Sequence, residues 1–73
     1  MAKIQIIGSK DKYDGMFIKN IDKANTKLTF TTEVREAYER SSGYYVQAEI
    51  DFLRFHFKDE YPCVAFAKEY NMY

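Results

Sequence analysis

Two side chains in this sequence of 73 residues have the chemistry of a catalytic pair: its single histidine, His56, and its single cysteine, Cys63. A cysteine nucleophile needs a neighbouring base and an electropositive setting that stabilises the thiolate. His56 could be that base, or a metal ligand, with its ring oriented by Glu49, two helical turns earlier on the same side. However, the sequence places no serine, threonine or second ligand near His56, and Cys63 is seven positions away in an apolar run. We therefore expect His56 to be a boundary residue at a partly hydrated edge and Cys63 to be a small buried side chain.

The acidic stretch does not have the pattern of a metal site, and the glycine-containing stretch does not have that of a phosphate-binding loop. Three glutamates recur at every third position, at Glu33, Glu36 and Glu39. On a helix this spacing spreads the carboxylates around the axis, and Arg35 and Arg40 lie among them, which indicates a solvated face with local ion pairs. Residues 8–15 begin and end with glycine but lack the Gly-Lys-Ser/Thr ending of a phosphate-binding loop. We therefore predict no catalytic residue, no metal, no cofactor and no enzymatic activity.

The longest apolar-rich run, residues 43–58, must position both Glu49 and His56, and it fits two periods. As a strand it alternates apolar and polar residues, but the alternation changes parity at Phe52–Leu53 and would need a bulge there. As a helix it has one apolar stripe at the spacing i, i+4, i+7, i+11, made of Val46, Ile50, Leu53 and Phe57. The helix explains both halves without a defect, so we interpret residues 44–58 as a helix, while a bulged strand stays open as the alternative.

The helix interpretation leaves a second apolar arc, separated from the first stripe by Glu49 and His56. Its members are Tyr45, Ala48, Phe52 and Phe55. A helix that is apolar on two sides needs two partners to cover it. A small sheet can cover one side, and the other requires the chain's own C-terminal segment or a second subunit. A chain of this size is marginally stable, and its single cysteine permits no internal disulfide, so we expect either a very efficient core or association with another chain, including a homodimer.

The rest of the chain supplies the elements that would pack against this run. Short β-branched or alternating runs predict strands at residues 3–8, 16–21 and 27–32. A brief polar turn separates the second run from the third, which favours an antiparallel hairpin. Residues 63–70 fit either a last strand, which we prefer, or a helix that begins at Pro62. We predict one domain, residues 1–73, of the α+β class: a small three- to four-stranded, mainly antiparallel sheet packed against one main helix, residues 44–58, with a short helix at 33–40.

The net charge is zero, but the charge is unevenly distributed. Residues 1–31 carry six lysines against three aspartates, for a net +3, and residues 32–73 carry five basic against eight acidic side chains, for a net −3. A neutral total argues against duplex DNA binding through bulk electrostatics, although the basic N-terminal part could contact an acidic partner. The sequence shows no apolar leader and no run long enough to cross a bilayer, so we predict a cytoplasmic protein without membrane association.

Six of the seven tyrosines lie in the second half of the chain. Exposed tyrosine is favoured at protein interfaces, and it also stacks on unpaired bases. Rings at element ends and on the second arc give six interface candidates: Tyr44, Tyr45, Phe52, Phe55, Tyr61 and Tyr73. The hypothesis that we favour is a surface that binds a protein partner. The alternative is a single-stranded nucleic-acid-binding protein that combines the lysines of residues 3–27 with stacking aromatic rings.

Two segments resemble small proteins encoded by phages and prophages. Residues 27–37 (Lys-Leu-Thr-Phe-Thr-Thr-Glu-Val-Arg-Glu-Ala) show a strand ending in Leu-x-Phe-Thr, an acidic turn and an Ala-bearing short helix, and an apolar helix follows. Residues 13–18 (Tyr-Asp-Gly-Met-Phe-Ile) are similar to the strand entry of such proteins. The resemblance covers about half of the chain and brings no catalytic residues. It implies a mobile-element protein of the host cell cytoplasm that binds a host or viral component.

Overall fold

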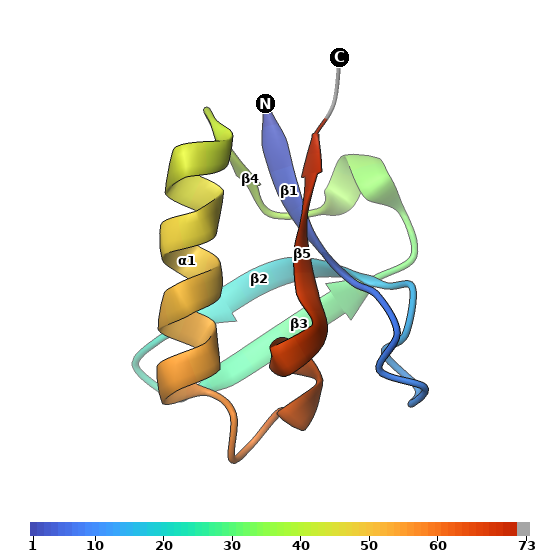
Figure 1. Cartoon of the computed structure of the whole chain (residues 1–73), viewed down its shortest axis with the longest axis vertical. Helices are drawn as coiled ribbons and strands as arrows, with labels where there is room; N and C mark the ends of the chain where they lie inside the picture. Colours follow the sequence, from blue (N-terminus) through green and yellow to red (C-terminus); the bar gives the residue numbers. More distant parts are fainter. Residues whose placement is uncertain (72–73) are drawn as a thin grey trace.

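Strand β1 (Ala2–Ile6) is the centre of the fold, because three other strands pair with it in an antiparallel sheet. The computed structural model describes residues 1–71 (Figure 1). Strand β5 (Ala67–Asn71) pairs with β1 along its whole length. Strands β4 (Glu39–Arg40) and β2 (Phe17–Asp22) share the other edge of β1, with β4 near its start and β2 at its end. The first and last described strands therefore lie side by side, and β5 forms one edge of the sheet.

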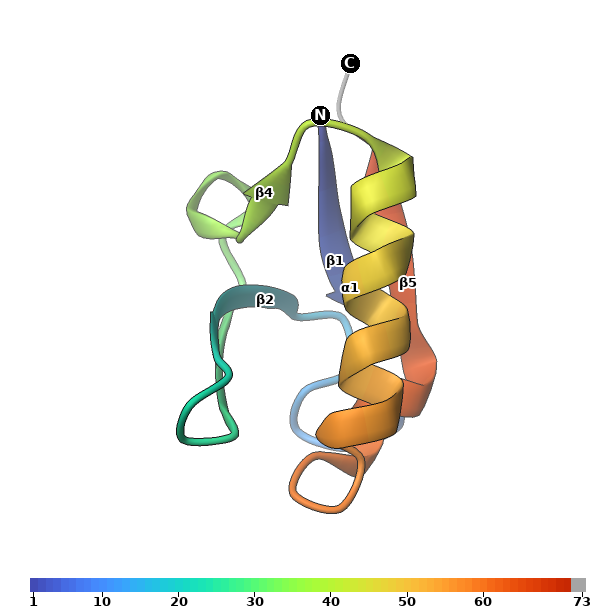
Figure 2. The same cartoon turned by 90° about the vertical axis from the view of Figure 1, so that its left-hand side faces the viewer.

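Strands β2 and β3 (Lys27–Thr31) form the predicted antiparallel hairpin, which extends away from β1 (Figure 2). The carboxylate of Asp22 closes the turn by accepting hydrogen bonds from the backbone and side-chain nitrogens of Asn25, at 3.2 and 2.9 Å. These bonds also lower the pKa of Asp22 below its ordinary value. Thr26 completes the turn in the left-handed region, with φ of 52°. The hairpin is thus fixed by local turn chemistry.

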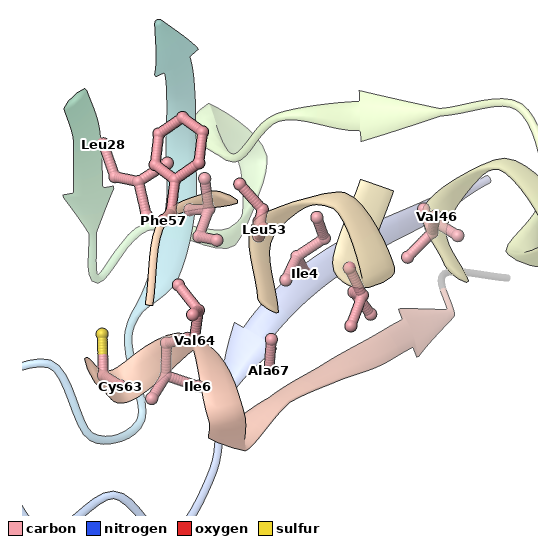
Figure 3. Packing of buried hydrophobic residues seen from close by; sticks show 12 residues of the cluster. Ile4, Ile6, Leu28, Val46, Leu53, Phe57, Cys63, Val64 and Ala67 are labelled. Atoms are coloured by element: carbon pink, nitrogen blue, oxygen red, sulfur yellow. The ribbon is translucent and has the colours of Figure 1, made fainter. Parts of the chain in front are cut away.

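Helix α1 (Gly43–His56) packs against β1, β4 and β5, which confirms the helical interpretation of the central run. Its buried stripe is the predicted one, with Val46, Ile50 and Leu53 in the helix and Phe57 as the C-cap residue, so α1 ends two residues before the predicted residue 58. These side chains meet aliphatic residues of the sheet and of the segment before β5, among them Ile4, Ile6 and Val64 (Figure 3). The core is therefore a single apolar layer between one side of α1 and the sheet.

The start of α1 lies against a residue of the last strand. Ser42 is the N-cap residue, but its side chain makes no capping hydrogen bond. The Glu69 carboxylate of β5 instead lies so close to Gly43 that a methyl group there would collide with it. A carboxylate at this end of a helix interacts favourably with the free backbone N–H groups and the positive end of the dipole. Glycine at position 43 leaves the room that this contact needs.

Residues 33–40 are less helical than the sequence predicts. They form one turn of 3-10 helix, Val34–Glu36, followed by the two-residue strand β4. Lys3 Nζ from β1 donates a hydrogen bond to the Val34 carbonyl. The Tyr38 N–H donates to a β2 carbonyl at 2.8 Å. These distant partners hold the backbone extended after the first turn, so that β4 becomes a fifth strand of the sheet.

The tail contains both structures that the sequence left open. Residues Pro62–Phe66 form a 3-10 helix with proline at its start, and β5 follows at once. The fixed φ of proline favours the helical turn, and pairing with β1 then keeps the last strand extended. The predicted class is confirmed, since one main helix packs against an antiparallel sheet in an α+β arrangement.

Candidate interaction surface

The side of α1 that faces away from the sheet is rich in exposed aromatic side chains. Tyr44 is 79% exposed, Phe55 is 75% exposed and Tyr45 is 46% exposed. Ala48 lies between them along the helix and is also exposed. We call these four residues the outer face of α1. It exists because the apolar residues of the helix fall on two arcs, and the sheet covers only the arc of the buried stripe.

The N-terminal end of the outer face is a pair of tyrosines beside an arginine. The rings of Tyr44 and Tyr45 meet edge to face, with centroids 5.4 Å apart. The guanidinium of Arg40, on β4, lies 5.4 Å from the centroid of Tyr45. Arg40 also donates a hydrogen bond to the Tyr38 hydroxyl at 2.9 Å. Tyr45 is therefore held in place by β4, whereas Tyr44 projects into solvent.

The C-terminal end of the outer face is a cluster of three rings. His56 lies 4.8 Å from Phe55 and 4.4 Å from Phe52, measured between ring centroids. Phe52 is partly buried against the core, and Lys23 Nζ lies over its ring at 4.4 Å from the centroid. His56 itself is exposed. The single histidine thus belongs to an aromatic cluster at the edge of the outer face.

The Glu49 carboxylate marks the border between the outer face and the core. Its Oε1 lies 3.4 Å from Lys23 Nζ and 3.9 Å from Arg40 Nη1. The side chain is only 12% exposed. Within residues 1–71, its Oε2 is a buried oxygen without a hydrogen-bond partner. Glu49 therefore ties α1 to the hairpin turn and to β4, and its carboxylate pairs with these two cations rather than with the ring of His56.

The Cys63 thiol is buried in the core, as the sequence predicts (Figure 3). Burial, followed by the negative charge of Asp11, raises the pKa of this thiol to about 11. A thiol with this pKa is protonated at neutral pH, whereas a cysteine nucleophile reacts as the thiolate. Cys63 is buried and His56 is exposed on the helix, so the two do not share one environment. Cys63 acts as a packing residue.

The remaining interface candidates are placed differently from the outer face. Tyr61 is partly buried against the core, and its ring lies 6.4 Å from Tyr13 and 6.0 Å from Phe30. Tyr13 and Phe30 stack with centroids 4.0 Å apart, so the three rings join the first loop, the hairpin and the segment after α1. Phe52 lies between the core and the outer face, and Tyr73 lies outside the described residues. Tyr44, Tyr45 and Phe55 are the candidates that the structure brings together on one exposed helix face.

Sequence reasoning missed one exposed apolar pair, Ile7 and Phe66. They are 46% and 42% exposed, and the Ile7 N–H donates to the Phe66 carbonyl at 3.0 Å. A signal was present in the Ile6–Ile7 dipeptide, because adjacent residues of a strand point to opposite faces and only one can enter the core. This pair continues the pairing of β1 with β5 and offers a smaller apolar surface than the outer face.

The described part of the chain has no pocket, and it has no group of three histidine, cysteine or acidic side chains that could hold a metal ion. Within residues 1–71, no helix reaches the length and apolar character of a membrane span. No protein-family model, curated protein or solved structure matches the chain. A functional proposal therefore depends on the surface of the molecule, above all on the outer face of α1.

Proposed function

We propose that this chain is a non-enzymatic binding protein that uses the outer face of α1 to bind a protein partner. The proposal is carried by the exposure of Tyr44 and Phe55, at 79% and 75%, on a helix whose opposite side forms the core. A buried aromatic side chain covers about 150–250 Å², so these two rings and Tyr45 leave about 400 Å² exposed. Apolar patches of this size on small proteins are often interaction sites.

The charges near the outer face favour a protein over single-stranded nucleic acid. Nucleic-acid binding needs cations beside the stacking rings to contact the phosphates. Three of the six lysines in residues 1–31 instead face carboxylates within 3.4 to 3.7 Å, in the pairs Lys3–Glu39, Lys19–Glu36 and Lys23–Glu49. Asp51 is exposed one turn before Phe55 on the same side of α1, where its carboxylate would repel a phosphate. A protein partner avoids this conflict.

The resemblance of residues 27–37 to phage and prophage proteins supports a phage-encoded origin for the chain. In that setting, the partner would be a host or viral protein in the cytoplasm of the host cell. The resemblance brings no catalytic residues, which agrees with a role in binding.

A photo-crosslinking amino acid in place of Phe55 tests the proposed function. The matched control carries the same group in place of Thr29, which is exposed on β3. We expect position 55 to give discrete protein adducts, with the purified chain or in host extract, and we expect Tyr44→Ser to weaken them. Identical adduct patterns from both positions would refute the proposal. Adducts to added single-stranded oligonucleotides that depend on Tyr44 would replace it with the nucleic-acid alternative.

A further inference from the structure

We infer that the outer face of α1 binds a second copy of this chain, so that two α1 helices pack antiparallel across a two-fold axis. This inference rests on the proposed function and names its partner. It follows from what the rest of the chain does, from the spacing of the helix residues and from the area that is exposed.

Up to residue 71, the chain's own C-terminal segment does not cover the outer face. Residues Pro62–Phe66 bury Cys63 and Val64 in the core, and β5 then pairs with β1 along its whole length. This segment is therefore committed to the sheet. Either the C-terminal segment or a second subunit could pack on the second apolar arc of α1. Within the described residues the C-terminal segment packs elsewhere, so the second subunit is the candidate that remains.

The spacing on the second apolar arc of α1 is that of the contact line between two packed helices, which we call the seam. Tyr45, Ala48, Phe52 and Phe55 follow the intervals i, i+3, i+7, i+10, which are the a and d positions of a heptad pattern. The side chains at the centre of the seam protrude little from the helix surface, because Ala48 is small and Phe52 is partly buried. At the two ends of the seam, Phe55 projects into solvent, and Tyr45, which is held against Arg40, keeps about half of its surface exposed. A low centre lets two helices approach closely.

An antiparallel arrangement matches the two copies better than a parallel one. It sets Ala48 against the partner's Phe52, so that a small side chain opposes a large one. It also brings the Tyr45 end of each helix to the partner's Phe55, and it aligns the helix dipoles in opposite directions. A parallel pair would instead oppose Ala48 with the partner's Ala48 and leave a gap between the flanking rings. The same patch then serves both copies, as a two-fold interface requires.

Area and charge set the expected strength of this dimer. The exposed rings amount to about 400 Å² on each copy, or about 800 Å² for the pair, which is below the size of stable specific interfaces and typical of weak, transient ones. The net charge of zero removes long-range repulsion between copies. Asp51 is the one opposing feature on the flank of the seam, because the antiparallel arrangement places it near the partner's Asp51. We therefore expect a weak, reversible dimer.

Sedimentation equilibrium of the purified chain, from about 5 to about 500 μM, tests the dimer in a range suited to a weak interface. Ala48→Arg places a charge at the centre of the seam and should raise the dimer Kd by about tenfold or more. Gln47→Arg is the matched control, because it adds the same side chain at the preceding exposed position, away from the seam, and should leave the Kd unchanged. Far-ultraviolet circular dichroism verifies that both variants keep the fold.

Asp51→Asn provides a second, opposite readout. Because it removes the like-charge contact near the two-fold axis, it should lower the dimer Kd by about twofold. A chain that stays monomeric throughout the range, or equal effects of Ala48→Arg and Gln47→Arg, would overturn the dimer. In that case, Tyr44-dependent adducts from position 55 in host extract would still uphold the proposed function. If such adducts were also absent, both the dimer and the proposed function would be refuted.

Discussion

Two neighbouring positions on α1 give the most direct test of how the helix divides its apolar residues. Leu53 is fully buried in the core, whereas Phe55, two residues later, is 75% exposed. Leu53→Ala removes buried methyl groups and leaves a cavity, so it should lower the free energy of unfolding by about 2–5 kcal/mol. The whole chain has about 4–11 kcal/mol of stability, in proportion to its 73 residues, so this loss is a large fraction of the total.

Phe55→Ala removes a larger side chain but should cost little in the monomer. Most of its ring is already in water, and alanine has a higher helix propensity than phenylalanine by about 0.5 kcal/mol. We therefore expect the free energy of unfolding to change by about 0.5 kcal/mol or less. If the proposed dimer forms, the same substitution should cost more at high protein concentration, because a dimer stabilises the folded state only where it is populated.

Urea unfolding followed by circular dichroism measures both effects. With an m-value of about 1 kcal/mol/M for a small domain, Leu53→Ala should lower the midpoint by about 2 M or more, and Phe55→Ala should leave it almost unchanged. The experiment is run at a concentration where sedimentation shows a monomer. If Phe55→Ala then lowers the midpoint as much as Leu53→Ala does, Phe55 is a core residue and the outer face does not exist.

Three further substitutions test the charges and the buried polar groups. Glu49→Ala should cost about 0.5–1 kcal/mol, since its cationic partners are partly exposed, and the loss seen in urea unfolding should shrink at high salt. The pKa of Cys63 is raised from 9.0 to about 11 in the folded chain, so its contribution is complete below pH 9 and is lost as the pH rises towards 11. The difference in unfolding free energy between the wild-type chain and Cys63→Ala should therefore fall by up to about 3 kcal/mol over that range, and a constant difference would contradict the shift. Lys3→Met keeps the buried aliphatic part of the side chain but leaves the Val34 carbonyl without its hydrogen-bond donor. It should lower the free energy of unfolding by about 1–2 kcal/mol in urea unfolding. An unchanged midpoint would mean that water replaces the ammonium group as the donor.

The elements with strong local signals could be predicted from the sequence. The stripe of Val46, Ile50, Leu53 and Phe57 has a helical period that no undistorted strand reproduces, and these residues form the buried side of α1 and its C-cap. The hairpin could be predicted because Asp22 and Asn25 close the turn through bonds within four residues of sequence. In both cases the information that fixes the structure lies inside the element itself.

Residues 33–40 could not be predicted in the same way, because their conformation depends on distant partners. A window of sequence shows an apolar spacing that suits a short helix. It does not show that Lys3 Nζ will reach the Val34 carbonyl, or that the Tyr38 N–H will pair with β2. The tail had a related difficulty, since proline determines its first part locally and β1 determines its last part from the other end of the chain.

The interface candidates show the same limit at the level of single side chains. Tyr44 and Tyr61 are the same residue type, and both lie near the end of an element. Tyr61 is partly buried because Tyr13 and Phe30 come to it from the first loop and the hairpin. Tyr44 is 79% exposed, with only the neighbouring Tyr45 beside its ring among the aromatic contacts described. The exposure of each tyrosine therefore depends on which distant side chains pack against it in the folded chain.

Charged residues explain why the fold leaves the outer face of α1 uncovered. A sheet that curled further around the helix could have buried both apolar arcs. Lys23 in the hairpin turn and Arg40 on β4 instead meet the Glu49 carboxylate at the border between the arcs. Moving these charges deeper would cost more in desolvation than their attraction returns. The hairpin therefore reaches α1 only as far as Phe52, whose ring Lys23 covers, and the rings of Tyr44, Tyr45 and Phe55 stay exposed.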